Sequence, residues 1–466
     1  RISTGLTDHI VEYGFRHYQI ISIMSSRIKI PNTGIPKQEL IEQLNAFKNS
    51  DVDWRHGRSW SLVYYGGDEH TDFLKDVYNL YFSENAAGPA LFPSLQRLEA
   101  EVVAMVLDLL GASGNEVGTM TSGGNESILL AVKAYRDRAR NLSPRIAKPE
   151  ILVPESAHPS FLKAAHYFDL HVISVPLNAD FEVDLDALRD RISNNTVCMV
   201  ASAPGFPQGV MDPVQAMGEI ALKFGIGLHV DACLGGFLLP FMHRLGYYVP
   251  EFDFRVPGVT SISADLHKNG YAAKGASAVL YRTNALRRYQ YFVNTKWSGG
   301  MYASPTMMGT RPAGPIAAAW ASMMSLGQDG YMQIAQRTMD VANALMEGIS
   351  SLPGLNIIGQ PAMSVFAFNA DDVDVFALGD RLDIKGWRVN RQNHPRSLHM
   401  IATPNHVQVV EEFLADLREA LENERRQPSE HQGKRGALLY GGTANIGDSS
   451  DLVETALSKL DELYRI

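Results

Sequence analysis

The sequence predicts an α/β fold: a mainly parallel sheet with helices on both faces, followed by a small α/β C-terminal domain. Two observations support this prediction. Short β-rich runs alternate with helical patterns from Val117 to Tyr281, and a second, shorter alternation runs from Ser364 to Arg426. At 466 residues the chain is also too long for one ordinary core. We therefore expect an N-terminal arm and loop segment, a large domain, and a connecting helix with the small domain, at residues 1–80, 81–313 and 314–466.

The composition excludes several classes of protein. Hydrophobic residues make up 45% and charged residues 20%, the balance of a soluble globular protein, and the net charge of -9 offers no basic face to nucleic acid. The two cysteines, Cys198 and Cys233, give neither a disulfide framework nor metal-ligand spacing, which favours a reducing, cytoplasmic location and no metal. No apolar run reaches the roughly 20 residues that a membrane-spanning helix needs. The chain begins at Arg1 without a methionine, which leaves room for an upstream segment.

The first part of the chain reads as an arm with a loop. An amphipathic stretch, Lys37 to Lys48, precedes an irregular segment rich in Gly, Trp and Tyr, Asp51 to His70. A helical period resumes at Thr71 to Phe82 and again at Ser94 to Leu110. In the second of these helices the apolar positions fall on one face: Leu95, Leu98, Val102, Met105, Val106 and Leu109.

The central part predicts the large sheet. The expected strands are Ile151–Val153, Val172–Val175, Val197–Ala201, Gly227–Val230, Ser261–Ser263 and Ser277–Leu280. The expected helices between them are Glu126–Arg140, Ser160–Phe168, Leu185–Ile192 and Pro213–Phe224. Because ligands of such sheets bind beyond the carboxyl ends of the strands, candidate functional residues are sought where the strands end.

The last part predicts a long helical region and the small domain. The expected elements are helices Ile316–Leu326 and Tyr331–Ser351, strand Ser364–Phe368, helix Val373–Leu382, strand Leu398–Ala402, helix His406–Arg426 and a final helix Asp451–Tyr464. A polar stretch, Gln427 to Arg435, and a Gly-rich run, Tyr440 to Gly447, precede the final helix.

The first candidate motif is a small-residue turn from Thr121 to Ser127, at the start of a helix. It contains Gly123, Gly124 and Asn125. N–H groups at a helix N-terminus and the helix dipole favour an anion, and glycines let the backbone approach it closely. The motif therefore indicates a phosphate site, although a Gly-Gly turn is also an ordinary helix start.

The second motif places a carboxylate, Asp231, directly after an apolar strand and before the small residues Ala232 to Gly236. An aspartate there lies at the carboxyl edge of the sheet, where it can bind a ligand nitrogen or only cap the next turn. Cys233 beside it is better read as a small buried hydrophobe than as a nucleophile.

The third motif is a lysine, Lys268, that closes another strand next to His267 and is followed by Lys274. A reachable, desolvated amine is what a Schiff base with an aldehyde needs. A His-Lys pair alone is common on surfaces. The order of phosphate turn, carboxylate and lysine, however, indicates pyridoxal 5′-phosphate, whose pyridine nitrogen pairs with a carboxylate such as Asp231.

With these motifs the chain resembles the sphingosine-1-phosphate lyases, within the group II decarboxylase-like branch of pyridoxal phosphate enzymes. The resemblance runs from about Ser59 to about Tyr464. It is carried by Ser122–Ser127, Ala157–His158, His229–Phe237, Ser261–Lys268 and Gly299–Thr306. It implies fold type I, the aspartate aminotransferase-like fold, with the cofactor in the large domain. It also implies cleavage of a phosphorylated long-chain amino alcohol to a fatty aldehyde and phosphoethanolamine.

The resemblance also implies roles for single residues. His158 would stack on the pyridine ring, Asp231 would bind its nitrogen, His267 would touch the phosphate, and Lys268 would carry the cofactor. The family is homodimeric with shared active sites, so the resemblance implies that Tyr64 and Asn85 reach into the partner's site. Lys274 would lie near the polar end of the substrate. Tyr64, Lys274 and Lys268 are all candidates for carrying the proton in bond cleavage.

The chain departs from the family pattern at four positions. Gly88 stands where the family has a histidine that helps hold the substrate phosphate. Asn125 and Leu266 stand where threonine is usual, and Gln208 replaces a histidine. Gly88 bears on the substrate rather than the cofactor, because a glycine offers the substrate phosphate at most its backbone N–H.

Three readings of the function follow. A carbon–carbon lyase is favoured by Tyr64 and by Gly299–Thr306. An amino-acid decarboxylase uses the same cofactor site, and Gly88 also permits a lyase acting on a different head group. A catalytically silent scaffold is disfavoured by the retention of Lys268, Asp231 and His158.

Overall fold

The structure, a computed structural model, describes residues 29–88, 90–429 and 450–463. The chain divides into two compact units, Asp53–Arg435 and a smaller unit made of Arg1–Val52 and Gly436–Ile466. In the smaller unit the described elements are α2 (Lys37–Phe47), a 3-10 turn (Lys48–Ser50) and α14 (Ser450–Leu463). The polar stretch beyond Ser429 and the Gly-rich run Tyr440–Gly447 lie outside the described residues. Among the described residues, no helix is both long enough and apolar enough to span a membrane.

The larger unit is built on a seven-stranded sheet in the order β1-β7-β6-β5-β4-β2-β3. Its strands are β1 (Val117–Thr121), β2 (Glu150–Pro154), β3 (His171–Val175), β4 (Thr196–Ser202), β5 (Gly227–Asp231), β6 (Ser261–Ala264) and β7 (Ser277–Tyr281). All neighbours pair in parallel except β7, which is antiparallel to both β1 and β6. The predicted fold class, a mainly parallel α/β sheet of fold type I, is confirmed.

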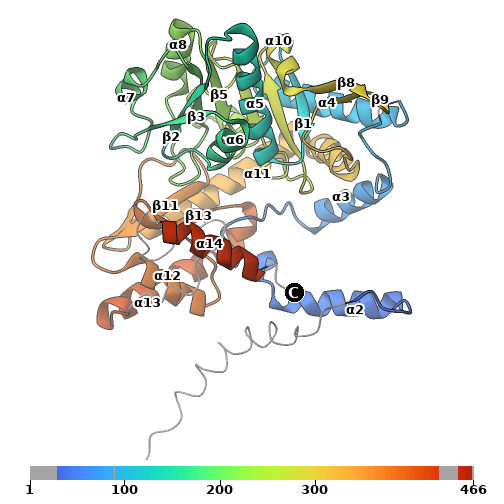
Figure 1. Cartoon of the computed structure of the whole chain (residues 1–466). Helices are drawn as coiled ribbons and strands as arrows, with labels where there is room; N and C mark the ends of the chain where they lie inside the picture. Colours follow the sequence, from blue (N-terminus) through green and yellow to red (C-terminus); the bar gives the residue numbers. More distant parts are fainter. Residues whose placement is uncertain (1–28, 89, 430–449, 464–466) are drawn as a thin grey trace, which may run out of the picture. The chain divides into compact units, whose positions relative to one another are not determined.

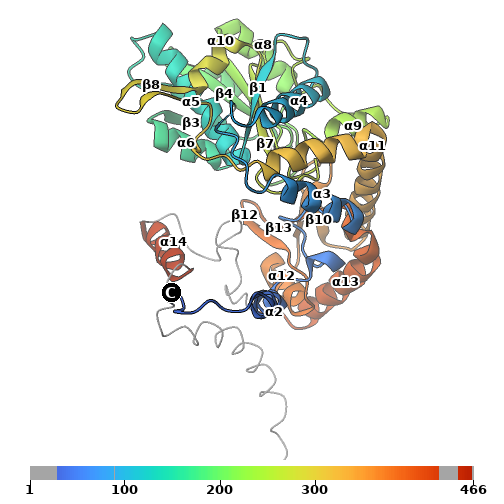
Figure 2. The same ribbon diagram turned by 90° about the vertical axis from the view of Figure 1, so that its right-hand side faces the viewer.

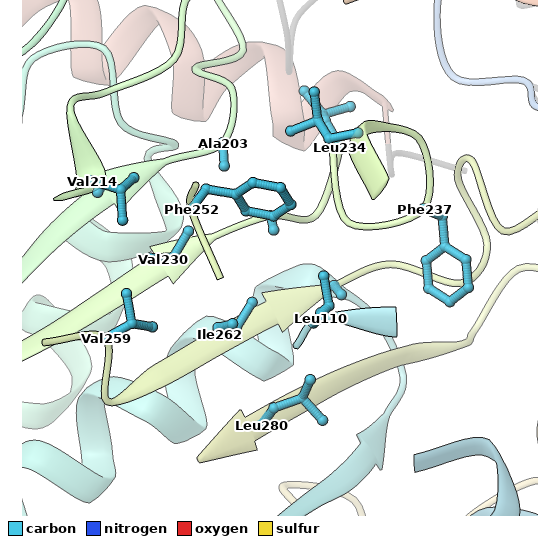
Figure 3. Packing of buried hydrophobic residues seen from close by; sticks show 14 of the residues in the cluster. Leu110, Ala203, Val214, Val230, Leu234, Phe237, Phe252, Val259, Ile262 and Leu280 are labelled. Atoms are coloured by element: carbon cyan, nitrogen blue, oxygen red, sulfur yellow. The ribbon is translucent and has the colours of Figure 1, made fainter. Parts of the chain in front are cut away.

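Helices cover both faces of this sheet (Figure 1). The helices of this part of the chain are α3 (Asp68–Leu80), α4 (Pro93–Leu109), α5 (Gly124–Leu142), α6 (Ser160–Phe168), α7 (Leu185–Asp190), α8 (Val214–Phe224), α9 (Leu239–Arg244), α10 (Asn284–Arg287) and α11 (Gly314–Ser350), of which α3 packs on α11. Alternation along β4 explains the two layers, since Cys198 and Val200 pack with α5 and α6 while Met199 and Ala201 pack with α4 and α8. Figure 3 shows the second of these layers, where Val230, Ile262 and Leu280 of neighbouring strands meet Leu110 and Phe252.

The small C-terminal domain carries a four-stranded antiparallel sheet in the order β10-β11-β13-β12. Its elements are β10 (Leu355–Ile357), β11 (Val365–Ala370), α12 (Val375–Ile384), β12 (Asn390–Asn393), β13 (Arg396–Ile401), a 3-10 helix (Pro404–Val409) and α13 (Val410–Arg426). Helix α11 runs from the large sheet to this domain (Figure 2). Gly327, at φ 57° and ψ -174°, breaks the helical backbone of α11, which explains the two separate helical periods in the sequence.

The segment before α3 is tied to the small domain. A 3-10 turn (Trp54–His56) leads to Trp60, which is fully buried and stacks on His406 with ring centroids 4.2 Å apart. The backbone N–H of Trp60 donates to Arg388 O, and Ile401 N donates to Trp60 O. These contacts fix the direction of the chain as it continues to Tyr64.

Two strands that the sequence did not predict form a separate hairpin, β8 (Phe292–Trp297) and β9 (Gly300–Ser304), which follows a 3-10 turn (Arg288–Gln290). Apolar side chains of this hairpin are exposed, for example Trp297 at 57% and Met301 at 75%. Such exposure on a well-formed hairpin is typical of a surface that another chain covers.

Candidate active site

Three chain segments converge at the carboxyl edge of the large sheet. Strands β5 and β6 pair in parallel, with Asp231 opposite Ser263, so the residues that follow both strands lie at the same edge. Strand β1 leads through Gly123 into the first turn of α5. The motifs that are far apart in the sequence therefore form one site.

The first turn of α5 lies against the loop after β6. A Cβ atom at Gly123 would lie 3.6 Å from His267 Cε1, and one at Gly124 would lie 2.8 Å from Cys233 Sγ and 2.9 Å from Asp265 Oδ2. Only glycine fits at position 124 without displacing buried groups. The N-terminal N–H groups of α5, with His267 beside them, can therefore hold a phosphate at close range.

Two side chains next to this turn have fixed orientations. His267 Nδ1 donates to Ala276 O at 2.6 Å, which leaves Nε2 facing the site, 3.8 Å from Asp265 Oδ2. Asn125, the second residue of α5, accepts a hydrogen bond from Ser160 Oγ, which is also 2.7 Å from His158 Nδ1. The phosphate turn and the ring of His158 are thus held together through Ser160.

Lys268 is paired with a buried carboxylate. Its Nζ lies 3.0 Å from Asp265 Oδ2, and the side chain of Asp265 is 2% exposed. Asp265 Oδ1 has no hydrogen-bond partner among the described residues. Burial is the largest single influence on the pKa of Lys268 and would lower it, but Asp265, together with Cys233, Tyr64 and Asp231, outweighs burial and raises that pKa. The amine is therefore held as an ammonium ion at the end of β6.

Asp231 is oriented by two donors on one oxygen. Its Oδ1 accepts from Cys233 N at 3.0 Å and from Ser263 Oγ at 3.2 Å. The second oxygen of this carboxylate can therefore pair with a ligand nitrogen. His158 lies near both Asp231 and Lys268, and burial lowers its pKa, so its ring is neutral and suited to stack on a flat ligand.

Tyr64 and Lys274 form a pair beside Lys268. Lys274 Nζ lies 5.2 Å from the centre of the Tyr64 ring and donates to His267 O at 3.2 Å. Burial and the nearby Lys268 ammonium lower the pKa of Lys274 to about 8. Burial raises the pKa of Tyr64 to about 12, and its hydroxyl has no hydrogen-bond partner among the described residues. Both side chains line a cavity of about 470 Å³ with Trp54 and His70.

Tyr64 and Asn85, the two residues expected to reach into a partner's active site, have different contacts in the structure. Tyr64 interacts with Lys274 and Lys268 of its own chain, which differs from the expectation that it reaches into the partner's site. The physical reason is the anchored segment around Trp60, which directs Tyr64 toward its own sheet edge. Asn85 instead accepts hydrogen bonds from Arg311 N at 3.1 Å and Ala87 N at 3.0 Å. No hydrogen bond of Asn85 reaches Lys268 within the described residues.

Sequence reasoning missed several residues behind the site. The motif that ends in Lys268 contains Asp265, but the sequence does not indicate that this carboxylate forms an ion pair with the lysine. His229 and Ser263, both buried, lie next to Asp231. The signal was present in the alternation of polar residues along β5 and β6, because positions two apart on a strand share a face.

The residues present fit pyridoxal phosphate. Lys268 offers an amine for its aldehyde, Asp231 offers a carboxylate for its pyridine nitrogen, and the first turn of α5 offers N–H groups for its phosphate. The close contacts that a Cβ atom at Gly124 would make with Cys233 and Asp265 explain why glycine is needed where the first turn of α5 packs against the residues that follow β5 and β6. Within the described part of the chain, no three His, Cys, Asp or Glu side chains come together as metal ligands would.

Comparisons with known proteins agree with this chemistry. A family model of the pyridoxal-dependent decarboxylase conserved domain matches residues 54–371. Sphingosine-1-phosphate lyase of Oryza sativa is 44% identical over 443 residues, which cover 93% of this chain and 81% of the relative. The solved sphingosine-1-phosphate lyase of Burkholderia pseudomallei superimposes with a TM-score of 0.87 at 37% identity, and covers 96% of this chain and 99% of its own. L-aspartate/L-glutamate decarboxylase of Pyrococcus horikoshii is 33% identical over 396 residues, 84% of this chain and 100% of the relative.

These matches confirm the resemblance drawn from the motifs, and with it pyridoxal 5′-phosphate as the cofactor and a lyase as the enzyme class. The similarity to the lyases is higher than that to the decarboxylase, at 44% against 33% identity. The chain therefore belongs to the sphingosine-1-phosphate lyase family of pyridoxal phosphate enzymes.

Proposed function

We propose that this chain cleaves the carbon–carbon bond of a phosphorylated long-chain amino alcohol, such as sphingosine 1-phosphate, to a fatty aldehyde and phosphoethanolamine. The names of the relatives support this substrate class. The observation that carries the proposal is the meeting of Lys268, Asp231 and the first turn of α5 at one edge of the sheet, with the Tyr64 and Lys274 pair directly beside them.

Three residues would bind the ring of the cofactor. Lys268 is proposed to bind it covalently through Nζ, Asp231 to hold the proton on its pyridine nitrogen, and His158 to lie on its face. When bound, pyridoxal phosphate supplies the electron sink that lets a bond to the amine-bearing carbon break. The two donors on Oδ1 of Asp231 orient this carboxylate toward the ring nitrogen, so they contribute to catalysis.

The phosphate of the cofactor would bind at the first turn of α5. Gly123 and Gly124 let the backbone N–H groups approach it, and Asn125 and His267 add side-chain donors. Anions are stabilised at a helix N-terminus by these N–H groups and by the helix dipole. The carboxylate of Asp265 lies beside the same turn, close to Gly124. Because Lys268 pairs with this carboxylate, the phosphate would not face an unpaired negative charge there.

Tyr64 and Lys274 are the proposed proton carriers. Cleavage requires that the substrate hydroxyl lose its proton as the aldehyde forms and that the amine-bearing carbon gain one. With a pKa of about 8, a useful fraction of Lys274 is neutral near neutral pH, roughly a tenth at pH 7, so it can accept the hydroxyl proton. Tyr64, with a pKa raised to about 12, stays protonated and is suited to donate.

We further propose a homodimer with shared active sites and a cytoplasmic location. The exposed apolar side chains of the β8–β9 hairpin support a partner, and a cavity of about 670 Å³ lies between this hairpin and α4. Asn85, whose neighbours Ala86 and Ala87 line that cavity, would serve the partner's site. The cysteines of the chain are both free and buried, which fits a reducing compartment.

An amino-acid decarboxylase is the second candidate. The relative from Pyrococcus horikoshii favours it, and so does Gly88, which lacks the side chain that would bind a substrate phosphate. A lyase that acts on a substrate with a different head group is equally compatible with a glycine at position 88.

Product analysis distinguishes the candidates. The purified holoenzyme is incubated with sphingosine 1-phosphate, with unphosphorylated sphingosine, and with aspartate and glutamate, and the products are analysed by mass spectrometry. We expect a long-chain aldehyde and phosphoethanolamine from the first substrate only. Carbon dioxide and a decarboxylated amine from an amino acid, without aldehyde from either lipid, would refute the lyase proposal.

A further inference from the structure

A chain of buried polar groups runs through the sheet behind Asp231. Tyr135 of α5 lies with its hydroxyl 2.6 Å from Ser261 Oγ, and Ser261 Oγ lies 2.8 Å from His229 Nδ1. His229 Nε2 lies 3.3 Å from Ser263 Oγ, which donates to Asp231 Oδ1 at 3.2 Å. The sheet explains this arrangement, because His229 pairs with Ser261 and Asp231 pairs with Ser263 in the parallel ladder.

The chemistry of the groups fixes the direction of the hydrogen bonds. A carboxylate only accepts, so Ser263 must donate its single proton to Asp231. His229 Nε2 must then carry the proton that it shares with Ser263 Oγ, which makes Nδ1 the acceptor from Ser261. The thiol of Cys233 approaches Ser263 Oγ at 3.4 Å, and burial raises its pKa, so it stays a second donor to that oxygen. Every donor in the chain therefore points toward Asp231.

We propose that His229 is a positioning residue for Asp231: through Ser263 it fixes the orientation of the carboxylate and keeps it an acceptor, so that the ring nitrogen of the cofactor stays protonated. This inference rests on the proposed role of Asp231 at the pyridine nitrogen. His229 itself would not touch the cofactor; it would act by orienting Asp231, which does.

Burial strengthens this coupling. His229 is 1% exposed and Ser261 and Ser263 are fully buried, so water does not compete for their hydrogen bonds. Burial also lowers the pKa of His229 to about 4, so the ring is neutral at physiological pH and can serve as acceptor and donor at once. Phe161 contacts the ring edge-on, with centroids 5.6 Å apart at 65°, and restrains its rotation.

Two substitutions of His229 separate the proposed role from simple packing. Gln places an amide nitrogen near the position of Nε2 and can still donate to Ser263, whereas Phe keeps the ring volume and offers no donor. Ser263→Ala removes the same link without changing the histidine. Ser364→Ala is the matched control, because Ser364 is a fully buried serine of the small domain whose hydroxyl has no hydrogen-bond partner among the described residues.

The experiment uses holoenzyme loaded with pyridoxal phosphate that carries ¹⁵N in its ring. The ¹⁵N chemical shift reports whether the ring nitrogen is protonated, and kcat and KM are measured on the same preparations. We expect His229→Phe and Ser263→Ala to shift the signal toward the unprotonated nitrogen and to lower kcat roughly 10- to 100-fold with little change in KM. His229→Gln should recover most of both effects, and Ser364→Ala should change neither.

The outcomes separate this inference from the proposal on which it rests. Asp231→Asn should unprotonate the ring nitrogen; if it does not, the role of Asp231 itself is wrong. If Asp231→Asn does so while folded His229→Phe and Ser263→Ala leave the signal and kcat at wild-type values, the positioning role of His229 is overturned. Should His229→Phe fail to fold, Ser263→Ala decides by the same two measurements.

Discussion

Removing the amine of Lys268 should destabilise the protein through Asp265, apart from any effect on catalysis. In the variant Lys268→Ala, the carboxylate of Asp265 loses the only ammonium that contacts it within the described residues; in the wild type its side chain is 2% exposed and its Oδ1 has no hydrogen-bond partner there. Breaking a buried ion pair from one side costs about 3–5 kcal/mol. Because the side chain of Lys268 is 26% exposed and water partly screens the pair, we expect a loss at or below the lower end of this range, about 2–3 kcal/mol.

The assay is chemical unfolding of the cofactor-free protein, so that ligand binding does not contribute. Wild type is compared with Lys268→Ala, Asp265→Asn and the double variant at pH 7.5. The double variant should regain most of the stability that Lys268→Ala loses, since a neutral amide tolerates burial better than an unpaired charge. Asp265→Asn alone should lose less than Lys268→Ala, because the partly exposed ammonium can turn toward water.

The pH dependence provides an independent check. In the wild type, burial opposes ionisation of Asp265, but Lys268 and His267 outweigh it and lower the pKa of Asp265, so this stabilisation is present above the unfolded pKa and is lost as the pH falls. In Lys268→Ala the pKa of the buried carboxyl should instead rise, which penalises folding at neutral pH and less so in acid. The difference between the two proteins should therefore shrink from pH 7.5 to pH 5.5. A double variant no more stable than Lys268→Ala, or a difference that does not change with pH, would refute this reasoning.

Four further predictions concern activity. Asp231→Asn should bind pyridoxal phosphate in a fluorescence titration yet lower kcat by more than roughly 100-fold; near wild-type rates with cofactor bound would contradict its role. In the wild type kcat/KM should rise with pH as Lys274 deprotonates around pH 8, and Lys274→Met should abolish that rise; a pH profile unchanged in the variant would exclude this lysine as the base. A Cβ atom at position 88 would lie 3.5 Å or more from its nearest neighbours, so the structure has room for Gly88→His. This variant should lower KM for the phosphorylated substrate by roughly ten- to 150-fold. An unchanged KM would mean that position 88 does not face the substrate. If Asn85 serves the partner, mixed dimers of Asn85→Ala and Lys268→Ala should regain activity that neither variant has, whereas failure despite subunit exchange would argue against shared sites.

The architecture was readable from the sequence wherever one physical pattern dominated. The alternation of apolar runs and helical periods predicted the parallel strands from β2 to β6, and the apolar stripe of α4 is the face that packs on the sheet. The antiparallel direction of β7 could not be predicted, because an apolar run of residues does not indicate in which direction a strand pairs with its neighbours. Strand β12 was missed since its residues are polar, and Arg391 in it is buried only because Asp380 and Asp383 neutralise it.

The sequence predicted the site residues that follow strand ends, but not the placement of residues that depends on contacts between distant parts of the chain. Lys268, Asp231 and the turn at Gly124 were found because each follows a strand that ends at the same edge. The own-chain placement of Tyr64 depends on the anchoring of Trp60 in the small domain, a contact between residues far apart in the chain. The role of His229 required the register of β5 against β6, which a single sequence does not contain.

The most direct test of the central claim is to locate the covalent attachment of the cofactor. The holoenzyme is reduced with borohydride, digested, and analysed by peptide mass spectrometry. We predict a phosphopyridoxyl group on Lys268, the amine held at the end of β6 beside Asp265. A label on Lys274, or on any other lysine, with Lys268 unmodified would contradict the assignment of the site.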